Sequence, residues 1–128
     1  MPFVEVASAQ NSSYRDDNPA IMVGTNSAAA IVALVPQASA TPGRVLVAAL
    51  AGEQRTGGYA IRIDRVERDG VRLVVHATFT EPAAGAIVTQ AFTSPAHVVS
   101  IAQADAAGLR EAVLLDGTGM ERARTTLP

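Results

Sequence analysis

The run from residue 71 to residue 80 constrains the fold of this chain more than any other stretch of the sequence. Every second side chain in it is apolar, this set being Val71, Leu73, Val75, Ala77 and Phe79. Side chains of a strand alternate between the two faces of a sheet, so this period of two predicts a strand with one buried face. The Asp69-Gly70 pair supplies the positive φ angles of a tight turn, and it predicts a hairpin with the strand before it.

Further segments of strand length follow one another along the chain, with turn signals between them. We expect strands over residues 3–9, 21–23, 45–50, 60–66, 86–93, 96–101 and 111–115. Residues 45–50 are apolar without interruption, which predicts burial on both faces. Ser27 is a candidate N-cap for a short helix over 28–35, which Pro36 would end; a strand is the alternative for these residues. Residues 118–128 are polar, and we expect a frayed tail there.

These segments predict one mainly β domain over residues 1–128. The expected fold is an antiparallel β-sandwich or partly open barrel of seven to eight strands with one short helix, because a parallel α/β sheet would need several helical crossovers. Hydrophobic residues make up 48% of the 128 residues and aromatic residues only 4%, so the core must consist of aliphatic side chains. A chain of this length can bury about two-thirds of its unfolded surface.

Charge and cysteine content exclude several functional classes. Ten basic residues, all arginine, face twelve acidic ones, and the net charge is −2. Binding to nucleic acid or to an anionic membrane requires a basic excess, so we expect neither partner. Without cysteine there is no disulfide, no thiolate nucleophile and no cysteine metal site. The start of the chain lacks the pattern of a signal peptide. We therefore expect a cytoplasmic protein if Met1 is the natural start, and an extracytoplasmic one if the chain was trimmed from a longer precursor.

Residues 51–59 form the candidate binding loop. The consecutive glycines Gly57 and Gly58 lie between two strand-like runs. Such a pair indicates a backbone that adopts positive φ or passes close to another segment. Thr56 can fix the turn through its hydroxyl group, and Tyr59 offers a large ring with a polar end. With Arg55, these residues would form a partner-recognition loop. The alternative is a tight structural connection in which Tyr59 anchors the next strand.

A second bend, comprising Thr93, Ser94, Pro95 and His97, could lie beside this loop and complete the binding surface. Its alternative is a bend at a sheet edge, caused by Pro95, which cannot donate to a strand ladder. Ser94 and His97 do not form a catalytic pair by their pattern, because residues three apart on a strand point to opposite faces. The two histidines show no metal-binding spacing. We therefore expect no catalytic residues, no metal ligands and no cofactor.

Three pieces of the sequence resemble the PrcB C-terminal domain family. They are residues 52–59 with the alternation that follows them, the Pro82 to Gly85 turn, and residues 88–99. Together they lie within residues 52–101. The family is named for a polypeptide associated with a protease complex, and the resemblance implies a non-catalytic accessory protein. A weaker similarity, confined to residues 56–59 and their flanking strands, is to chagasin-like protease inhibitors, which insert a loop into a protease cleft.

We therefore predict a non-catalytic protein–protein interaction module. The resemblance implies a protease as the partner, and residues 55–59 with the second bend would form the contact. A β-sandwich that binds a small ligand or glycan is the alternative, with Tyr59 and the glycine pair lining a shallow site. A minor enzyme of unknown type is a third possibility.

Overall fold

The computed structural model describes residues 1–24 and 28–127, which form eight strands and two short helices. The strands are β1 (Val4–Ala9), β2 (Ala20–Val23), β3 (Arg44–Leu50), β4 (Ala60–Asp69), β5 (Arg72–Thr80), β6 (Ala96–Ala102), β7 (Glu111–Leu115) and β8 (Glu121–Thr126). The helices are α1 (Ala28–Leu34) and α2 (Gln103–Ala106), the latter a single turn. The predicted cap Ser27 lies outside the described residues.

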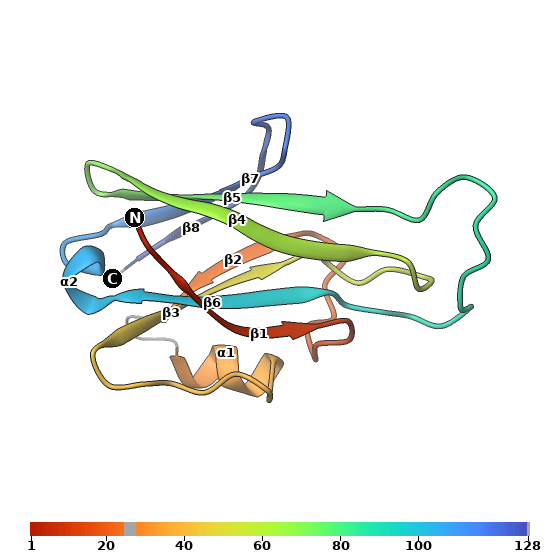
Figure 1. Cartoon of the computed structure of the whole chain (residues 1–128), viewed down its shortest axis with the longest axis horizontal. Coiled ribbons are helices and arrows are strands. Elements are labelled where there is room, and N and C mark those ends of the chain that lie inside the picture. The colour runs from red at the N-terminus through yellow and green to blue at the C-terminus, as the bar shows by residue number, and fades with distance from the viewer. Residues whose placement is uncertain (25–27, 128) are drawn as a thin grey trace.

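The strands form two stacked sheets of four strands each (Figure 1). The first sheet has the order β1-β6-β3-β2, and the second has the order β4-β5-β7-β8. All neighbours are antiparallel except β5 and β7, which run parallel. This pair departs from the predicted antiparallel sheet. After β5 the chain crosses to the first sheet as β6 and returns through α2, so β7 starts beside the start of β5, with Glu111 opposite Arg72.

Two apolar layers stabilise this arrangement. The main core lies between the sheets and contains the predicted inward side chains Leu73, Val75 and Ala77. A second layer lies between the outer face of the first sheet and α1, where Ile31 packs. Strand β3 contributes to both layers, since its odd-numbered valines face the other sheet and its even-numbered residues face α1. The prediction that this strand is buried on both faces is therefore confirmed.

The sequence-based fold class is confirmed as a mainly β sandwich, and no closed barrel forms. Two segments were assigned wrongly. Residues 86–93 form no strand, although Thr93 makes an isolated bridge to Gln54. The expected frayed tail instead contains β8, which pairs along the whole of β7. The polar sequence of β8 gave no strand signal, because an edge strand with one solvated face needs few apolar residues.

Candidate functional site

The predicted binding loop, residues 51–59, connects β3 to β4 and is here called the Gly-Gly loop. Its side chains differ in exposure: Arg55 is exposed and forms no ion pair with any described residue, whereas Thr56 and Tyr59 are half-buried. Gly58 is exposed and Gly57 is buried. The loop therefore presents Arg55 and part of Tyr59 to solvent, and its other face packs against a neighbouring segment.

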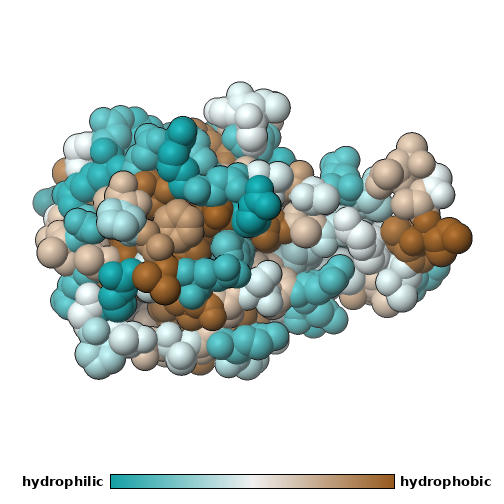
Figure 2. Space-filling model, in the orientation of Figure 1, coloured by the Kyte–Doolittle hydropathy of each residue, from teal (hydrophilic) through white to brown (hydrophobic). Residues whose placement is uncertain are grey.

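That neighbour is the connection from β5 to β6, of which residues 81–92 are here called the arm. It extends well beyond the sandwich and returns (Figure 1). Ile87 is completely exposed at 102%, and Phe92 is 61% exposed. Figure 2 shows strongly hydrophobic residues at the outer end of this projection. The arm has the local composition of a strand, but no other strand of the described chain lies beside its outer part. It therefore stays irregular.

The two glycines allow the arm to approach the Gly-Gly loop. The Gly57 N–H donates to the Thr89 carbonyl at 3.0 Å. A Cβ atom on Gly57 would lie 2.6 Å from the Thr89 Oγ1 atom, and one on Gly58 would lie 2.8 Å from Pro82. Gly58 also has φ of +89°, which side chains other than glycine rarely adopt. This packing supports the structural alternative for the glycine pair, and it identifies the arm as the segment that the pair holds.

The structure brings the second predicted bend beside the Gly-Gly loop. Thr93 and Gln54 exchange backbone hydrogen bonds of 2.7 and 2.9 Å, and the Thr93 hydroxyl donates to the Thr56 carbonyl at 2.8 Å. However, Thr93, Ser94, Pro95 and His97 are all buried. They support the Gly-Gly loop from behind and do not form a contact surface. Pro95 precedes an interior strand, and its carbonyl accepts from the Ala51 N–H, so the bend is not at a sheet edge.

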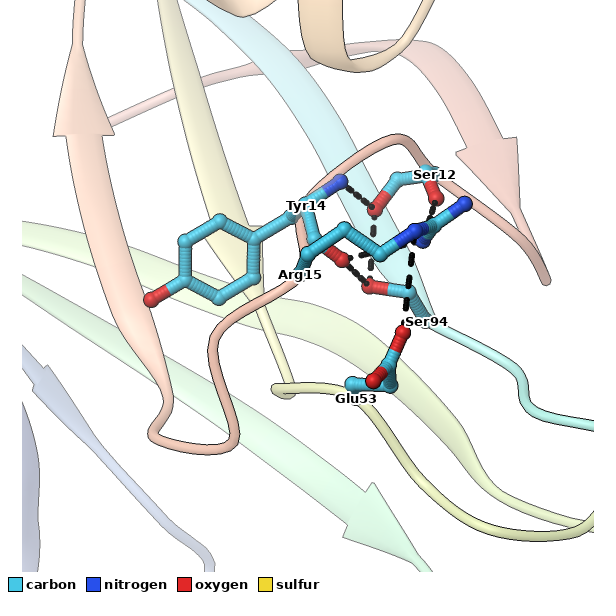
Figure 3. A network of polar contacts seen from close by, with 5 residues as sticks. All are labelled: Ser12, Tyr14, Arg15, Glu53 and Ser94. Atoms are coloured by element: carbon cyan, nitrogen blue, oxygen red, sulfur yellow. Dashed lines mark hydrogen bonds and ion pairs between the residues drawn. The ribbon is translucent and has the colours of Figure 1, made fainter.

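Ser94 is the centre of a buried polar network (Figure 3). Its hydroxyl accepts from the Ser12 hydroxyl at 3.0 Å and donates to the Tyr14 carbonyl at 2.8 Å. Arg15 donates to the Ser12 carbonyl and lies 3.6 Å from a Glu53 carboxylate oxygen. The network fastens residues 10–19 to both loops of the candidate site. Sequence analysis missed it, since serines in a polar loop give no signal of burial.

Tyr14 points its ring away from this network, and its hydroxyl donates to the Asn18 carbonyl at 3.0 Å. Partial burial, with a smaller contribution from the Asp16 charge, raises the pKa of this hydroxyl. The group is therefore a neutral donor that closes the turn of residues 14–18.

His97 links the two sheets. Its Nδ1 atom accepts from the Ile63 N–H at 2.8 Å, and its Nε2 atom lies 3.3 Å from a Glu5 carboxylate oxygen. Accepting at Nδ1 places the ring proton on Nε2, which can donate to Glu5. Both ring nitrogens are thus engaged in bonds that join β6 to β4 and β1. The expected structural role of this histidine agrees with the geometry.

Asp64 lies next to this junction as the extra residue of a β-bulge in β4. Partial burial raises the pKa of its carboxyl group, but hydrogen bonds from Thr78 and Arg62, together with the Arg62 charge, lower it by more. The pKa therefore lies below its usual value. The carboxylate is satisfied by neighbours on the exposed face of the second sheet and is not poised for proton transfer.

A hollow of about 540 Å³ lies at the base of the arm. The rings of Tyr59 and Phe92 line it together with Asp17, Glu53, Gln54 and Arg55. Phe92 and Asp17 were not among the predicted site residues. Among the described residues, no group of three acidic or histidine side chains could hold a metal ion. Within the same residues, no helix has the length and apolarity needed to cross a bilayer.

Comparison with known families identifies the part of the chain that carries this site. The PrcB C-terminal family model matches residues 45–102, which extend from β3 to the end of β6. This segment is therefore similar to the PrcB C-terminal family. The resemblance predicted over residues 52–101 is therefore confirmed. The PrcB C-terminal segment contains the Gly-Gly loop, the arm and the second bend. No curated protein and no solved structure matches the chain significantly.

Proposed function

We propose that this chain is a non-catalytic protein-binding module, associated with a protease as its family name suggests, and that the arm makes the contact. One observation carries the proposal: residues 87–92 combine a strand-like sequence with unpaired backbone N–H groups, although the Thr89 carbonyl accepts from the Gly57 N–H at the base of the arm. Among the described residues, none accepts a hydrogen bond from the N–H groups of Ile87 through Phe92. The side chains of residues 82–92 carry no charge. Such a segment can add to the open sheet edge or extended cleft of a partner.

Ile87 supplies the apolar anchor of this contact. Its side chain contacts water on all sides, and burying it fully in a partner pocket would contribute roughly 1.5–3 kcal/mol. The base of the arm is already fixed by the Gly57 hydrogen bond and by Pro82 packing on Gly58. Less conformational entropy is lost on docking when part of the binding segment is ordered in advance. The Gly-Gly loop thus serves binding by bracing the arm, with Arg55 and Tyr59 at the margin of the contact.

The bonds of Ser94 and His97 support the non-catalytic part of the proposal. Ser94 has no exposed surface, and both its donor and acceptor capacities are used within the buried network. His97 accepts a backbone hydrogen bond at the nitrogen that a general base would need free. A substrate could not reach Ser94 without local unfolding. His97 lines a hollow of about 380 Å³, but its Nδ1 atom is held by the Ile63 N–H. The likeness of the Gly-Gly loop to chagasin-like inhibitors stays a prediction.

Substitution of Ile87 tests the proposal. Tagged protein is used to capture proteases from extracts of its source cells, and each captured protease is purified and titrated by calorimetry. Ile87→Glu should weaken binding roughly 10- to 100-fold, because the anchor energy is lost. Val71→Glu is the matched control, since Val71 is an exposed apolar residue (54%) in the β4–β5 turn, away from the arm. Equal affinity of the two variants for the protease would refute the arm as the contact.

The hollow at the base of the arm favours a second candidate function, recognition of a small ligand such as a saccharide. Two aromatic rings can stack on a sugar while the carboxylates of Asp17 and Glu53 accept from its hydroxyl groups. The volume of about 540 Å³ lies in the range of small-molecule sites. Ligand-observed NMR with a panel of monosaccharides and disaccharides tests this function. Tyr59→Ala should abolish the signals and Ile87→Glu should preserve them; absence of any signal with the unaltered protein would exclude it.

A further inference from the structure

The arginine residues divide into two groups by their partners. Six of the ten arginine side chains lie within ion-pair distance of an acidic group: Arg15, Arg62, Arg65, Arg72, Arg122 and Arg124. Among the described residues, Arg44, Arg55, Arg68 and Arg110 have no acidic partner. Arg55 belongs to the Gly-Gly loop. The other three lie around α2, at the end of the sandwich opposite the arm (Figure 1).

A hollow of about 670 Å³ opens at this end. Its long polar side chains come from Arg44, Gln103 and Arg110. Much of the rest of its lining has little or no side chain, as at Gly43, Ala107 and Gly108. No acidic side chain of the described chain lines it. Unpaired guanidinium groups in a concave site of small residues create a positive potential, although the protein as a whole is slightly acidic.

Two of the three arginines are held in position by the fold. Arg44 donates from Nε to the Ser100 hydroxyl at 3.2 Å and from Nη2 to the Ser100 carbonyl at 2.8 Å, which leaves its charge uncompensated. Arg68 donates from Nη1 to the carbonyls of Asp105 and Ala107 at 3.0 and 2.6 Å, and so supports the wall that contains Gly108. Arg110 is exposed, and none of the described residues bonds its guanidinium group.

We propose that this hollow binds a small organic anion carrying a phosphate or carboxylate group. The guanidinium group of Arg110 would hold the oxyanion by paired N–H donors, which match the geometry of both groups. Arg44 would add a second positive charge, and the Gln103 amide could donate to a neutral part of the ligand. The volume of the hollow suits a metabolite larger than the bare ion. This site is independent of the arm, which lies at the opposite end.

Titration with inorganic phosphate, phenyl phosphate and succinate, followed by amide NMR shifts and calorimetry, tests the proposal. We expect saturable shifts at residues 43–45 and 103–110, with tighter binding of phenyl phosphate or succinate than of inorganic phosphate. Arg110→Ala should weaken binding at least tenfold, and Arg110→Lys should restore part of it. Arg55→Ala is the matched control, because it removes another exposed, unpaired arginine at the other end of the molecule.

The outcomes separate a built site from general attraction of anions. Equal weakening by Arg110→Ala and Arg55→Ala would mean that only the net charge matters, and it would overturn the site. The same conclusion would follow from shifts spread over the whole surface, or from no saturation by any of the three anions. Thermal midpoints of all variants within a few degrees of one another would show that the fold is retained. Loss of affinity confined to the Arg110 variants would then establish the site.

Discussion

Replacing Gly58 with alanine tests whether the glycine pair exists to hold the arm. The φ angle of +89° costs a residue with a side chain roughly 1–2 kcal/mol. The new Cβ atom would also lie 2.8 Å from the Pro82 Cβ atom and 3.1 Å from a Val88 methyl carbon. Overpacking of this kind adds about 1–3 kcal/mol, because the proline ring cannot rotate away. The expected loss in the free energy of unfolding is therefore about 2–5 kcal/mol.

Gly85→Ala is the matched control for this substitution. Gly85 also has positive φ, of +79°, but nothing lies within 4 Å of the position of its Cβ atom. Its replacement should cost only the backbone contribution of roughly 1–2 kcal/mol. The difference between the two variants isolates the contact between the arm and the Gly-Gly loop.

Urea unfolding of both variants measures the difference, and amide hydrogen exchange locates it. If the clash detaches the arm, the Gly57 N–H loses the Thr89 carbonyl and should exchange faster in Gly58→Ala but not in Gly85→Ala. Equal losses of stability in the two variants, with unchanged exchange at Gly57, would refute the bracing role of the glycine pair.

Three further substitutions test the supports of the site. His97→Ala should lower the free energy of unfolding by at least about 1–3 kcal/mol in urea unfolding, because the Ile63 N–H loses its acceptor; a neutral effect would contradict the link between the sheets. Ser94→Ala should cost about 1–3 kcal/mol, because the buried Ser12 hydroxyl loses its acceptor and the Tyr14 carbonyl keeps only its bond from Arg15; stability equal to that of the unaltered protein would show that water replaces the hydroxyl. Asp64 has a lower pKa in the folded state than its ordinary value of 3.8, so its carboxylate stabilises the fold above that pH and the contribution is lost as pH falls. Asp64→Asn should therefore reduce the loss of stability below pH 4, and an unchanged acid limb of the unfolding curve would contradict this.

Strands that bury an alternating or continuous apolar pattern were predictable from the sequence. The period of two over residues 71–80 and the apolar run at 45–50 encode burial directly, and the structure forms β5 and β3 there. The nearness of the two candidate loops was also predicted correctly. Such features depend on local pattern, which a single sequence contains.

Pairing between distant segments could not be read in the same way. Residues 86–93 have the composition of a strand, but a strand needs a neighbour, and the order of strands in the sheets provides none for them. Residues 121–126 show the opposite case: their composition is not that of a strand, but they form one because β7 lies beside them. Ion pairs of Arg124 with Glu111 and Glu121 add to this pairing. The burial of Ser94 and His97 likewise results from residues more than thirty positions away in the sequence.

The edge strands β1, β4 and β8 differ from the arm in how well they are protected against pairing with another chain. Strand β4 is an edge strand. The His97 ring accepts the hydrogen bond of its Ile63 N–H, and a bulge at Asp64 interrupts its pairing with β5. On β1 a bulge interrupts the pairing after Glu5, and β8 carries three charged residues, Glu121, Arg122 and Arg124. Each of these devices discourages another chain from pairing with the edge. The outer residues of the arm carry no charge, and within residues 1–24 and 28–127 no bulge and no covering segment protects them. An exposed strand-like segment of this kind is an aggregation hazard, and the proposed partner would remove that hazard by covering it.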